Sequence, residues 1–229
     1  MGVKKAIPLT KPAHQYVSID RCVGERIGVD ASVWLHEIAA NPTLTETVVV
    51  KEDYGRLVAA FIARANKMVK LGIIPIFVFD GERAPQKNAT SEARQKQRAN
   101  RLASYEALSV SVGLHEGATE RKEILAIMAA HLRAAISVTK AMVSNVIEAL
   151  RHRALAYYIA PLEADGQLAW LCKCGLVRAV FTSDTDLIFL GCEFVYLKIN
   201  WHDNTALLIE RAALSKVPIG NLDTPPPHS

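Results

Sequence analysis

Two short apolar segments between residues 155 and 190 each run directly into a pair of acidic residues. The first segment, LAYYIAP, leads to Glu163 and Asp165, and the second, VRAVFTS, leads to Asp184 and Asp186. The residues between them, GQLAWLCKCG, have the apolar spacing of a helix. A strand, a helix and a second strand in this order form the βαβ unit of a parallel sheet. The chain is therefore predicted to adopt an α/β fold in which helices flank a mainly parallel central sheet.

Two further apolar segments also end in an acidic residue. The segment RIGVD ends at Asp30, and IIPIFVFD ends at Asp80. The carboxyl ends of parallel strands meet at one edge of a sheet, which is where open α/β sheets bind their ligands. We therefore expect six carboxylates to share that edge: Asp30, Asp80, Glu163, Asp165, Asp184 and Asp186.

Each of these acids also has an ordinary structural interpretation. Asp30 could form a local Asx turn, and Asp80 with Gly81 is a common turn pair. The two later pairs could lie in the first turns of their helices or cap them. These interpretations do not explain the whole set, because turn-forming acids need not select the same end of every strand. Carboxylates gathered in this way repel one another unless a cation lies between them.

A cluster of oxygen ligands without His or Cys suits Mg²⁺ or Mn²⁺. Two such ions about 4 Å apart are a known arrangement for the in-line attack of water on a phosphodiester. One ion lowers the pKa of the attacking water, and both stabilise charge on the attacking and leaving oxygens. The acidic edge therefore predicts a two-metal phosphodiesterase site.

The segment from residue 81 to residue 101, GERAPQKNATSEARQKQRANR, is polar and basic and lacks large apolar side chains. It is predicted to be helical after Pro85, without a face to bury. A solvated helix is the ordinary interpretation of such a run. This segment follows Asp80 directly, so its basic face is predicted to lie above the acids and to bind phosphates there. Four basic residues share that face: Lys87, Arg94, Arg98 and Arg101.

The remaining elements are predicted from periodicity and turn residues. Ser32 is expected to cap a helix formed by VWLHEIAA, and Gly72 to end a strongly amphipathic helix. Residues 1–25 are expected to form an extended arm, and Trp34 and Trp170 are assigned to the core. The other expected elements are helices at 54–71, about 119–133 and about 138–152, and a β pair, EFVYLKIN and TALLIE, around the turn at 202–204.

Composition narrows the class of protein only modestly. A formal net charge of +4 suits a polyanionic partner, although many proteins without one share it. Four cysteines in 229 residues are typical of reduced thiols in an intracellular protein. Cys172 and Cys174 could bind zinc in principle, but they lack a second ligand pair at the usual spacing. The sequence has no recognisable secretory signal or membrane span, so no membrane partner is predicted.

Several segments resemble the structure-specific 5′ nucleases typified by flap endonuclease, the XPG repair endonuclease and exonuclease 1. They are MGV, IGVDASVWLH, GIIPIFVFDGERAPQK, AISVTKAMVSNVI and APLEADGQLAWLCKCGLVRAVFTSDTDLIFLGC. The resemblance extends to about Ala213, and its most specific part is the EAD string followed by T-x-D-x-D-L-x-x-x-G. The EAD form, the LIFLGC and YLKIN segments and His36 resemble the exonuclease 1 branch most.

The resemblance implies a PIN-like 5′-nuclease domain over residues 1–214, with a basic helical arch at about 82–135. It implies that the six acids hold two Mg²⁺ ions, with Mn²⁺ as the alternative, and that they act in catalysis together with Lys87 and Arg94. These two basic residues would stabilise charge on the scissile phosphate. The residues assigned to DNA binding are Gly2, His36, Lys87, Arg94 and Arg98. For His36, stacking on a base or contacting a phosphate and an ordinary, partly buried position are equally open.

The sequence departs from the family pattern at its end. The family continues into a helix with a seventh metal-site aspartate and then into a helix–two-turn–helix segment that grips duplex DNA. This sequence ends at Ser229, and residues 215–229 are expected to be a disordered tail. The nuclease domain is therefore expected to be C-terminally truncated, with an under-coordinated second metal.

The leading interpretation is a Mg²⁺-dependent DNA nuclease that cuts near 5′ ends or 5′ flaps during repair. The expected partners are DNA with 5′ ends, flaps, nicks or gaps, and repair or replication proteins, and the resemblance implies a nuclear location. One alternative is a truncated, weakly active or inactive DNA-binding form of such a nuclease. Another is an RNA-cutting nuclease of the related PIN fold, which the basic arch and the EAD string disfavour.

Overall fold

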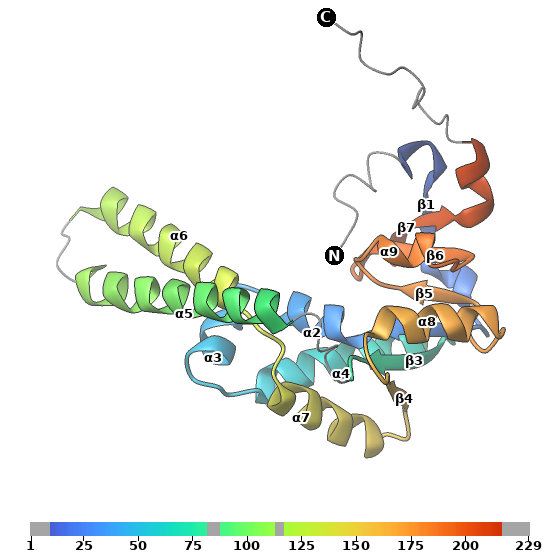
Figure 1. Cartoon of the computed structure of the whole chain (residues 1–229), viewed down its shortest axis with the longest axis horizontal. Helices are drawn as coiled ribbons and strands as arrows, with labels where there is room; N and C mark the ends of the chain where they lie inside the picture. The colour runs from blue at the N-terminus through green and yellow to red at the C-terminus, as the bar shows by residue number, and fades with distance from the viewer. Residues whose placement is uncertain (1–9, 82–87, 113–116, 217–229) are drawn as a thin grey trace, which may run out of the picture.

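A seven-stranded sheet forms the centre of the computed structural model, which describes residues 10–81, 88–112 and 117–216 (Figure 1). The strand order is β1-β7-β6-β5-β2-β3-β4. The five strands from β6 to β4 are parallel, whereas β7 is antiparallel to β6 and β1 is antiparallel to β7. The predicted mainly parallel α/β fold is confirmed. The strands are β1 (His14–Ser18), β2 (Arg26–Asp30), β3 (Ile74–Phe79), β4 (Ala156–Ile159), β5 (Ala179–Phe181), β6 (Phe194–Asn200) and β7 (Thr205–Glu210).

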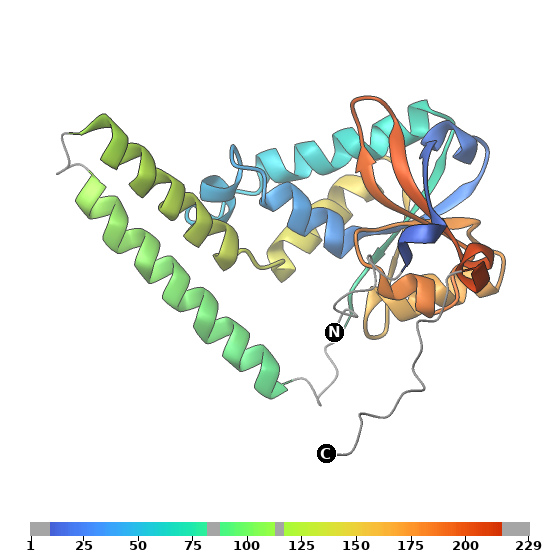
Figure 2. The same ribbon diagram turned by 90° about the horizontal axis from the view of Figure 1, so that it is seen from above.

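Helices cover both faces of the sheet (Figure 2). One face packs against α2 (Ala31–Ala39), α4 (Gly55–Lys70) and α7 (Lys140–Arg151). The other face packs against α8 (Ala164–Lys173) and α9 (Asp186–Phe189). Side chains alternate between these two cores along each strand. In β3, for example, Phe77 and Phe79 enter the first core and Val78 enters the second.

Gly28 in the middle of β2 allows α8 to lie close to the sheet. A Cβ atom at this position would come within 2.7 Å of Leu168 Cδ2 on α8. The missing side chain therefore sets how near the helix approaches the strand. This approach matters for the acidic edge, because Asp30 ends β2 and Asp165 lies in the first turn of α8.

Two long helices, α5 (Asn88–Ser111) and α6 (Ala118–Ala135), lie side by side and extend away from the sheet (Figures 1 and 2). No side chain described in α5, from Glu92 onward, is buried, as expected for a helix without an apolar face. By contrast, α6 buries Met128 and Leu132. A short helix that was not predicted, α3 (Thr45–Val49), contacts α6.

Most of the other predicted elements are present. The amphipathic helix is α4, and Gly72 follows it with a φ of +77°, a conformation that glycine adopts without strain. The helices predicted at about 119–133 and about 138–152 are α6 and α7. The predicted β pair is the antiparallel pair β6–β7. In the part of the chain that the structure describes, no single helix is long and apolar enough to cross a membrane, and α6 with α7 meets that test only as a pair bent by 76°.

Three predictions are wrong. Of the predicted extended arm, residues 1–9 lie outside the described residues, and residues 10–25 contain the short 3₁₀ helices η1 (Lys11–Ala13) and η2 (Ile19–Cys22) and the edge strand β1. Strand β1 pairs with β7, a distant partner that HQYVS alone does not reveal. Trp170 is 54% exposed, because Leu168 and Leu171 face the core and Trp170 points away from it, whereas Trp34 is buried as predicted. The cap of α2 is Asp30 rather than Ser32.

Candidate active site

All six predicted acids lie at the carboxyl ends of four neighbouring strands, in the sheet order β5-β2-β3-β4. Two of them end or follow strands of the sheet centre: Asp30 is the last residue of β2, and Asp80 directly follows β3. The EAD pair lies where the chain passes from β4 into α8, and the last pair lies where it passes from β5 into α9. The topology thus gathers residues that are up to 156 positions apart in the sequence, Asp30, Asp80, Glu163, Asp165, Asp184 and Asp186.

The electrostatics show that these six carboxyl groups act on one another. Burial raises the pKa of Asp165 to about 6, and the neighbouring Asp184, Asp80, Asp186 and Glu163 add to the rise. Burial also raises the pKa of Asp30 to about 7, with further contributions from Asp165 and Asp80. Hydrogen bonds from Val33 and Thr182 act in the opposite direction on Asp30.

Every charged group that shifts the pKa of Asp30 or Asp165 is itself a carboxyl group. Repulsion of this kind is relieved by protonation or by a bound cation. The donor set fits a hard divalent cation, because it supplies several negatively charged oxygens and no sulfur or imidazole ligand. In the described part of the chain, no group of three or more His, Cys, Asp or Glu side chains already converges as a metal cage. Closing one would therefore need the side chains to turn toward the ion.

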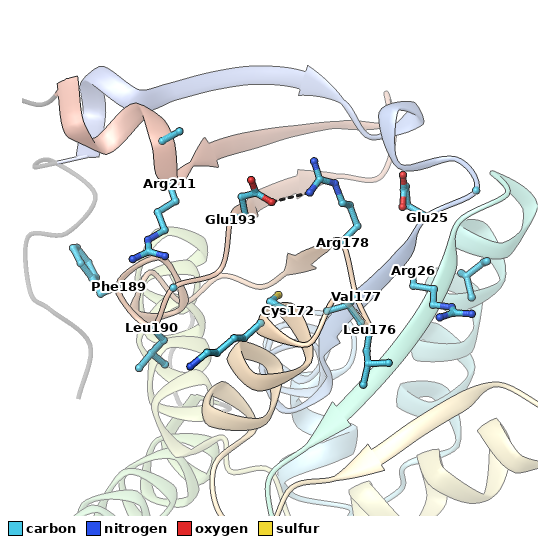
Figure 3. Close-up of a pocket in the computed structure, with 16 residues that line it drawn as sticks. Glu25, Arg26, Cys172, Leu176, Val177, Arg178, Phe189, Leu190, Glu193 and Arg211 are labelled. Carbon is cyan, nitrogen blue, oxygen red and sulfur yellow. Dashed lines mark hydrogen bonds and ion pairs between the residues drawn. The ribbon is translucent and has the colours of Figure 1, made fainter.

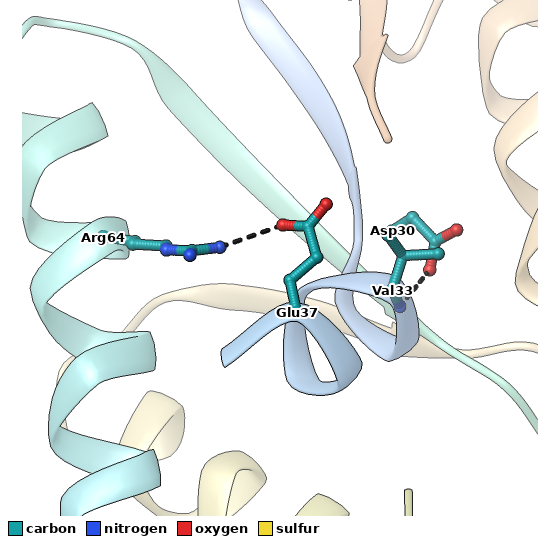
Figure 4. Close-up of polar contacts among 4 residues, drawn as sticks. All are labelled: Asp30, Val33, Glu37 and Arg64. Atoms are coloured by element: carbon teal, nitrogen blue, oxygen red, sulfur yellow. Dashed lines mark hydrogen bonds and ion pairs between the residues drawn. The ribbon is translucent and has the colours of Figure 1, made fainter. Parts of the chain in front are cut away.

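Asp30 is held by hydrogen bonds at both carboxylate oxygens and is only 3% exposed. Oδ1 accepts from the backbone N–H of Val33 at 3.0 Å, and Oδ2 accepts from the hydroxyl of Thr182 at 3.2 Å. On the side of α2 that faces α4, Arg64 donates to Glu37 at 3.1 Å (Figure 4). This ion pair lies away from Asp30, so the arginine does not neutralise the buried carboxylate.

Further hydrogen bonds join the four segments that carry the acids. The backbone N–H of Asp80 donates to Ser32 Oγ at 3.2 Å, and Asp80 Oδ1 accepts from the N–H of Ala164 at 2.8 Å. The N–H of Asp184 donates to Thr182 Oγ1 at 3.0 Å, and Asp184 Oδ1 accepts from the N–H of Asp186 at 3.0 Å. The carboxylates therefore lie on segments that are held together by hydrogen bonds rather than on free loops.

Two of these bracing residues were not identified from the sequence as parts of the site. Ser32 was expected to cap α2, but its hydroxyl instead accepts from the next strand's Asp80. Thr182 opens the T-x-D-x-D string, but that string does not reveal that the hydroxyl reaches Asp30 on another strand. Gly81 was interpreted as an ordinary turn residue, yet a Cβ there would lie 1.7 Å from the carbonyl oxygen of Ala160. The sequence therefore marked these residues by their position next to the acids, but it did not reveal which distant residues they contact.

The predicted basic residues are placed unevenly. Arg94 is exposed on α5, as is Arg101. Arg98 is half-buried and donates to Ser137 Oγ at 2.8 Å, so part of its hydrogen-bonding capacity ties α5 to the segment before α7. Gly2 and Lys87 lie outside the described residues.

His36 is exposed on α2 and lies close enough to Arg98 of α5 to feel its charge. Partial desolvation lowers its pKa, and the Arg98 guanidinium adds to this effect, with Glu37 acting in the opposite direction. A lowered pKa favours the neutral imidazole at pH 7. The ring is therefore suited to stacking or hydrogen bonding rather than to pairing with a phosphate as a cation.

A groove of about 1200 Å³ lies at the opposite edge of the sheet, where β2, β3 and β5 begin (Figure 3). Arg178 donates to Glu193 across it at 2.7 Å, and none of the six acids lines it. Cys172, one of the two cysteines considered for zinc, also faces this groove and lies near the buried Cys192, whereas Cys174 is exposed. This groove and the acidic edge are therefore separate features of the molecule.

A mainly parallel sheet with a row of carboxylates along one rim defines an α/β protein whose candidate ligand site lies at its strand ends. Solved structures share this fold. The catalytic core of Rad2 in complex with a DNA substrate matches with a TM-score of 0.65 and 24% identity, over 94% of this chain and 57% of that one. A GEN1 complex with product DNA, Mg²⁺ and Mn²⁺ matches with a TM-score of 0.58 and 18% identity, over 95% of this chain and 42% of that one.

The sequence comparisons give the family. Residues 1–101 match the XPG N-terminal domain and residues 154–222 match the XPG I-region, and the chain belongs to the XPG family of nucleases. Exonuclease 1 of Danio rerio is 30% identical over 226 residues, which is 98% of this chain and 26% of that protein. Exodeoxyribonuclease 1 of Schizosaccharomyces pombe is 28% identical over 225 residues, 98% of this chain and 37% of that protein. The chain thus spans well under half the length of these two relatives.

Proposed function

We propose that this chain is a divalent-metal-dependent DNA nuclease that hydrolyses phosphodiesters near 5′ ends or 5′ flaps in DNA repair. The observation that carries the proposal is the set of six carboxyl groups at one sheet edge, each in electrostatic contact with others of the set. Family membership supports it, and so do the relatives named exonuclease 1. The proposed partners are DNA with 5′ ends, flaps, nicks or gaps, together with repair or replication proteins, in the nucleus.

The six acids would hold two Mg²⁺ ions, or Mn²⁺, and these ions when bound would polarise water and neutralise phosphate charge. The chain's own residues then have three tasks. Asp30, held at both oxygens, supplies a fixed ligand, while the half-buried Asp165, Asp184 and Asp186 supply ligands from the first turns that follow β4 and β5. Asp80 and Glu163 are the exposed members of the set and face the entering substrate.

The basic residues of the proposed arch would bring the phosphate to this edge. Arg94 is exposed on α5 and free to contact a phosphate oxygen, and Lys87 precedes the same helix in the sequence. Arg98 of α5 lies near His36 of α2, and together they would meet the DNA strand. Gly2 is assigned to the DNA-contacting arm by resemblance alone. Electrostatic attraction of this kind weakens as salt rises.

A DNA-binding protein that does not cleave is the second candidate. The observation in its favour is that no three described acids already converge as a metal cage. The two candidates predict different behaviour toward the same substrates, because a binding protein retains labelled DNA without shortening it.

The test is incubation of the chain with end-labelled 5′-flap, nicked-duplex and single-stranded DNA in Mg²⁺ and in EDTA. Asp184→Ala removes one proposed ligand, and Glu25→Ala removes an exposed carboxyl group at the opposite edge of the sheet as a matched control. We expect Mg²⁺-dependent cleavage by the wild type and by Glu25→Ala, and none by Asp184→Ala. Cleavage that survives in Asp184→Ala would contradict the metal site, and binding without cleavage by the wild type would establish the second candidate.

A further inference from the structure

Thr182 lies at the point where the ladder between β2 and β5 ends. The last pair in that ladder joins Val29 to Phe181. The residues that follow this last pair are Asp30 on β2 and Thr182 after β5. A hydrogen bond between their side chains joins the two segments beyond the end of the backbone ladder. Thr182 is only 4% exposed, and its hydroxyl makes the contact between these two strands.

The direction of the hydrogen bonds at Thr182 is set by its partners. The backbone N–H of Asp184 can only donate, and it does so to Thr182 Oγ1 at 3.0 Å. The hydroxyl proton is then left to be donated to Asp30 Oδ2 at 3.2 Å. One hydroxyl therefore joins the side chain of one acid to the backbone of another.

This arrangement fixes Asp30 without using up its capacity to bind a cation. Oδ1 receives the Val33 N–H and Oδ2 receives the Thr182 hydroxyl. Each carboxylate oxygen accepts about two hydrogen bonds or metal contacts, so each retains one further lone pair. The rotation of the carboxylate is thereby restricted, and the remaining lone pairs keep a constant direction.

We propose that Thr182 is a positioning residue that holds the Asp30 carboxylate and the backbone of Asp184 at a fixed separation, so that both segments keep their places at the proposed metal site. The inference rests on the proposed function, since it assumes the metal site at this edge. Outer partners that orient ligands of this kind typically change metal affinity by about 10–100-fold when they are removed. Thr182 touches neither substrate nor reacting atoms in this role.

Two substitutions separate the hydroxyl from the shape of the side chain. Thr182→Val keeps the branched shape and removes the hydroxyl, whereas Thr182→Ser keeps the hydroxyl and removes a methyl group. Thr45→Val is the matched control, because Thr45 is 3% exposed and its hydroxyl donates to the carbonyl oxygens of Ala39 and Asn41, both at 2.9 Å. The Thr45→Val substitution removes an equally buried hydroxyl from the first residue of α3, away from the acids.

The experiment is calorimetric titration of the four proteins with Mn²⁺, in parallel with thermal unfolding in EDTA. We expect Thr182→Val to bind Mn²⁺ about 10–100-fold more weakly than the wild type, and Thr182→Ser to remain within about threefold of it. Thr45→Val should lower the melting temperature but bind Mn²⁺ as the wild type does. This contrast separates a positioning role from a general loss of stability.

Wild-type Mn²⁺ affinity in Thr182→Val, or an equal loss in Thr182→Ser and Thr182→Val, would overturn the inference. An equal loss in Thr45→Val would also overturn it, because the effect would then follow from stability alone. A wild-type chain that binds no divalent ion would overturn both this inference and the proposed function. Normal binding of Mn²⁺ without DNA cleavage would refute only the proposed function and leave the role of Thr182 supported.

Discussion

Gly81→Ala is the substitution whose effect on the acidic edge can be worked out most fully from the structure. Gly81 follows Asp80 directly, and its N–H donates to the carbonyl oxygen of Leu162 at 2.6 Å. A Cβ at this position would lie 1.7 Å from the carbonyl oxygen of Ala160, whereas real Cβ atoms essentially never come within 3.0 Å of another heavy atom. The obstacle is backbone, so no side-chain rotation can relieve it.

The backbone must therefore move by more than about 1 Å, the difference between those two distances. Ala160 cannot retreat alone, because its own N–H donates to Phe79 O at 2.9 Å in the continuation of the β3–β4 ladder. Overpacking of this kind costs about 1–3 kcal/mol, and each backbone hydrogen bond lost adds about 1 kcal/mol. For a chain of this size, a total of about 3 kcal/mol lowers the melting temperature by about 6–12 °C.

The same movement separates Asp80 from Glu163, which lie on the two segments that must part. A misplacement of about 1 Å at a reacting centre costs about 100-fold in rate. Gly166→Ala is the control, because Gly166 lies in α8 near the same acids and an added Cβ meets no atom within 4 Å. Alanine favours a helix over glycine by up to about 1 kcal/mol, so this variant should be at least as stable as the wild type.

The measurement compares thermal unfolding in EDTA and flap cleavage in Mg²⁺ for the wild type and these two variants. Gly81→Ala should lose both stability and at least about 100-fold in cleavage rate, and Gly166→Ala should lose neither. A Gly81→Ala protein with wild-type melting temperature and rate would refute the reasoning, because it would mean that the close approach of the two backbones is not required.

Three further predictions follow from the site and its surroundings. Arg94→Ala should slow cleavage by about 100-fold or more and weaken DNA binding much less, because a group that acts on transition-state charge affects the rate beyond the affinity. Single-turnover rates and DNA binding in Ca²⁺ measure the two effects. Equal losses would mean that Arg94 only contacts phosphate. In EDTA, chemical unfolding should show that the free energy of unfolding falls as the pH rises from about 4 to about 7 and then levels off. Asp30 and Asp165 have raised pKa values of about 7 and about 6, so the folded state binds more protons than the unfolded state in that window. A flat profile would contradict the clustering of the acids. Trp34→Ala should cost about 3–5 kcal/mol of stability in urea unfolding, because the side chain is buried against Phe61 and Phe77. The exposed Trp170 is the comparison, and Trp170→Ala should change stability by less than about 1 kcal/mol. Equal costs would show that Trp170 is packed.

The parallel direction of the main strands could be predicted from the sequence, because it follows from local patterns. Apolar runs of strand length alternate with a helical spacing, and a strand–helix–strand unit allows only a parallel pairing. That rule is enough to send Asp30, Asp80 and the two later acidic pairs to the same edge of the sheet. The turn between β6 and β7 and the stop at Gly72 were likewise encoded by turn and glycine chemistry.

Long-range pairings could not be predicted in this way. Strand β1 is a strand because its backbone groups pair with β7, about 190 positions later, and nothing in HQYVS indicates that partner. Trp170 is exposed because of the direction in which α8 faces the sheet, which its own apolar character does not determine. Both errors arise because a local pattern gives the type of an element but not the neighbour that it meets.

The sequence by itself determined that six carboxylates would gather at one sheet edge, because each follows a strand and parallel strands share their carboxyl ends. Only the tertiary structure decided how those carboxylates are held. The hydroxyl of Thr182 reaches Asp30 across 152 positions, and the N–H of Asp80 reaches Ser32 across 48. Such contacts depend on strand register and on the depth at which α8 packs over Gly28. Hydrogen bonds form or fail over a few tenths of an ångström, and that precision exists only once the whole sheet has been assembled.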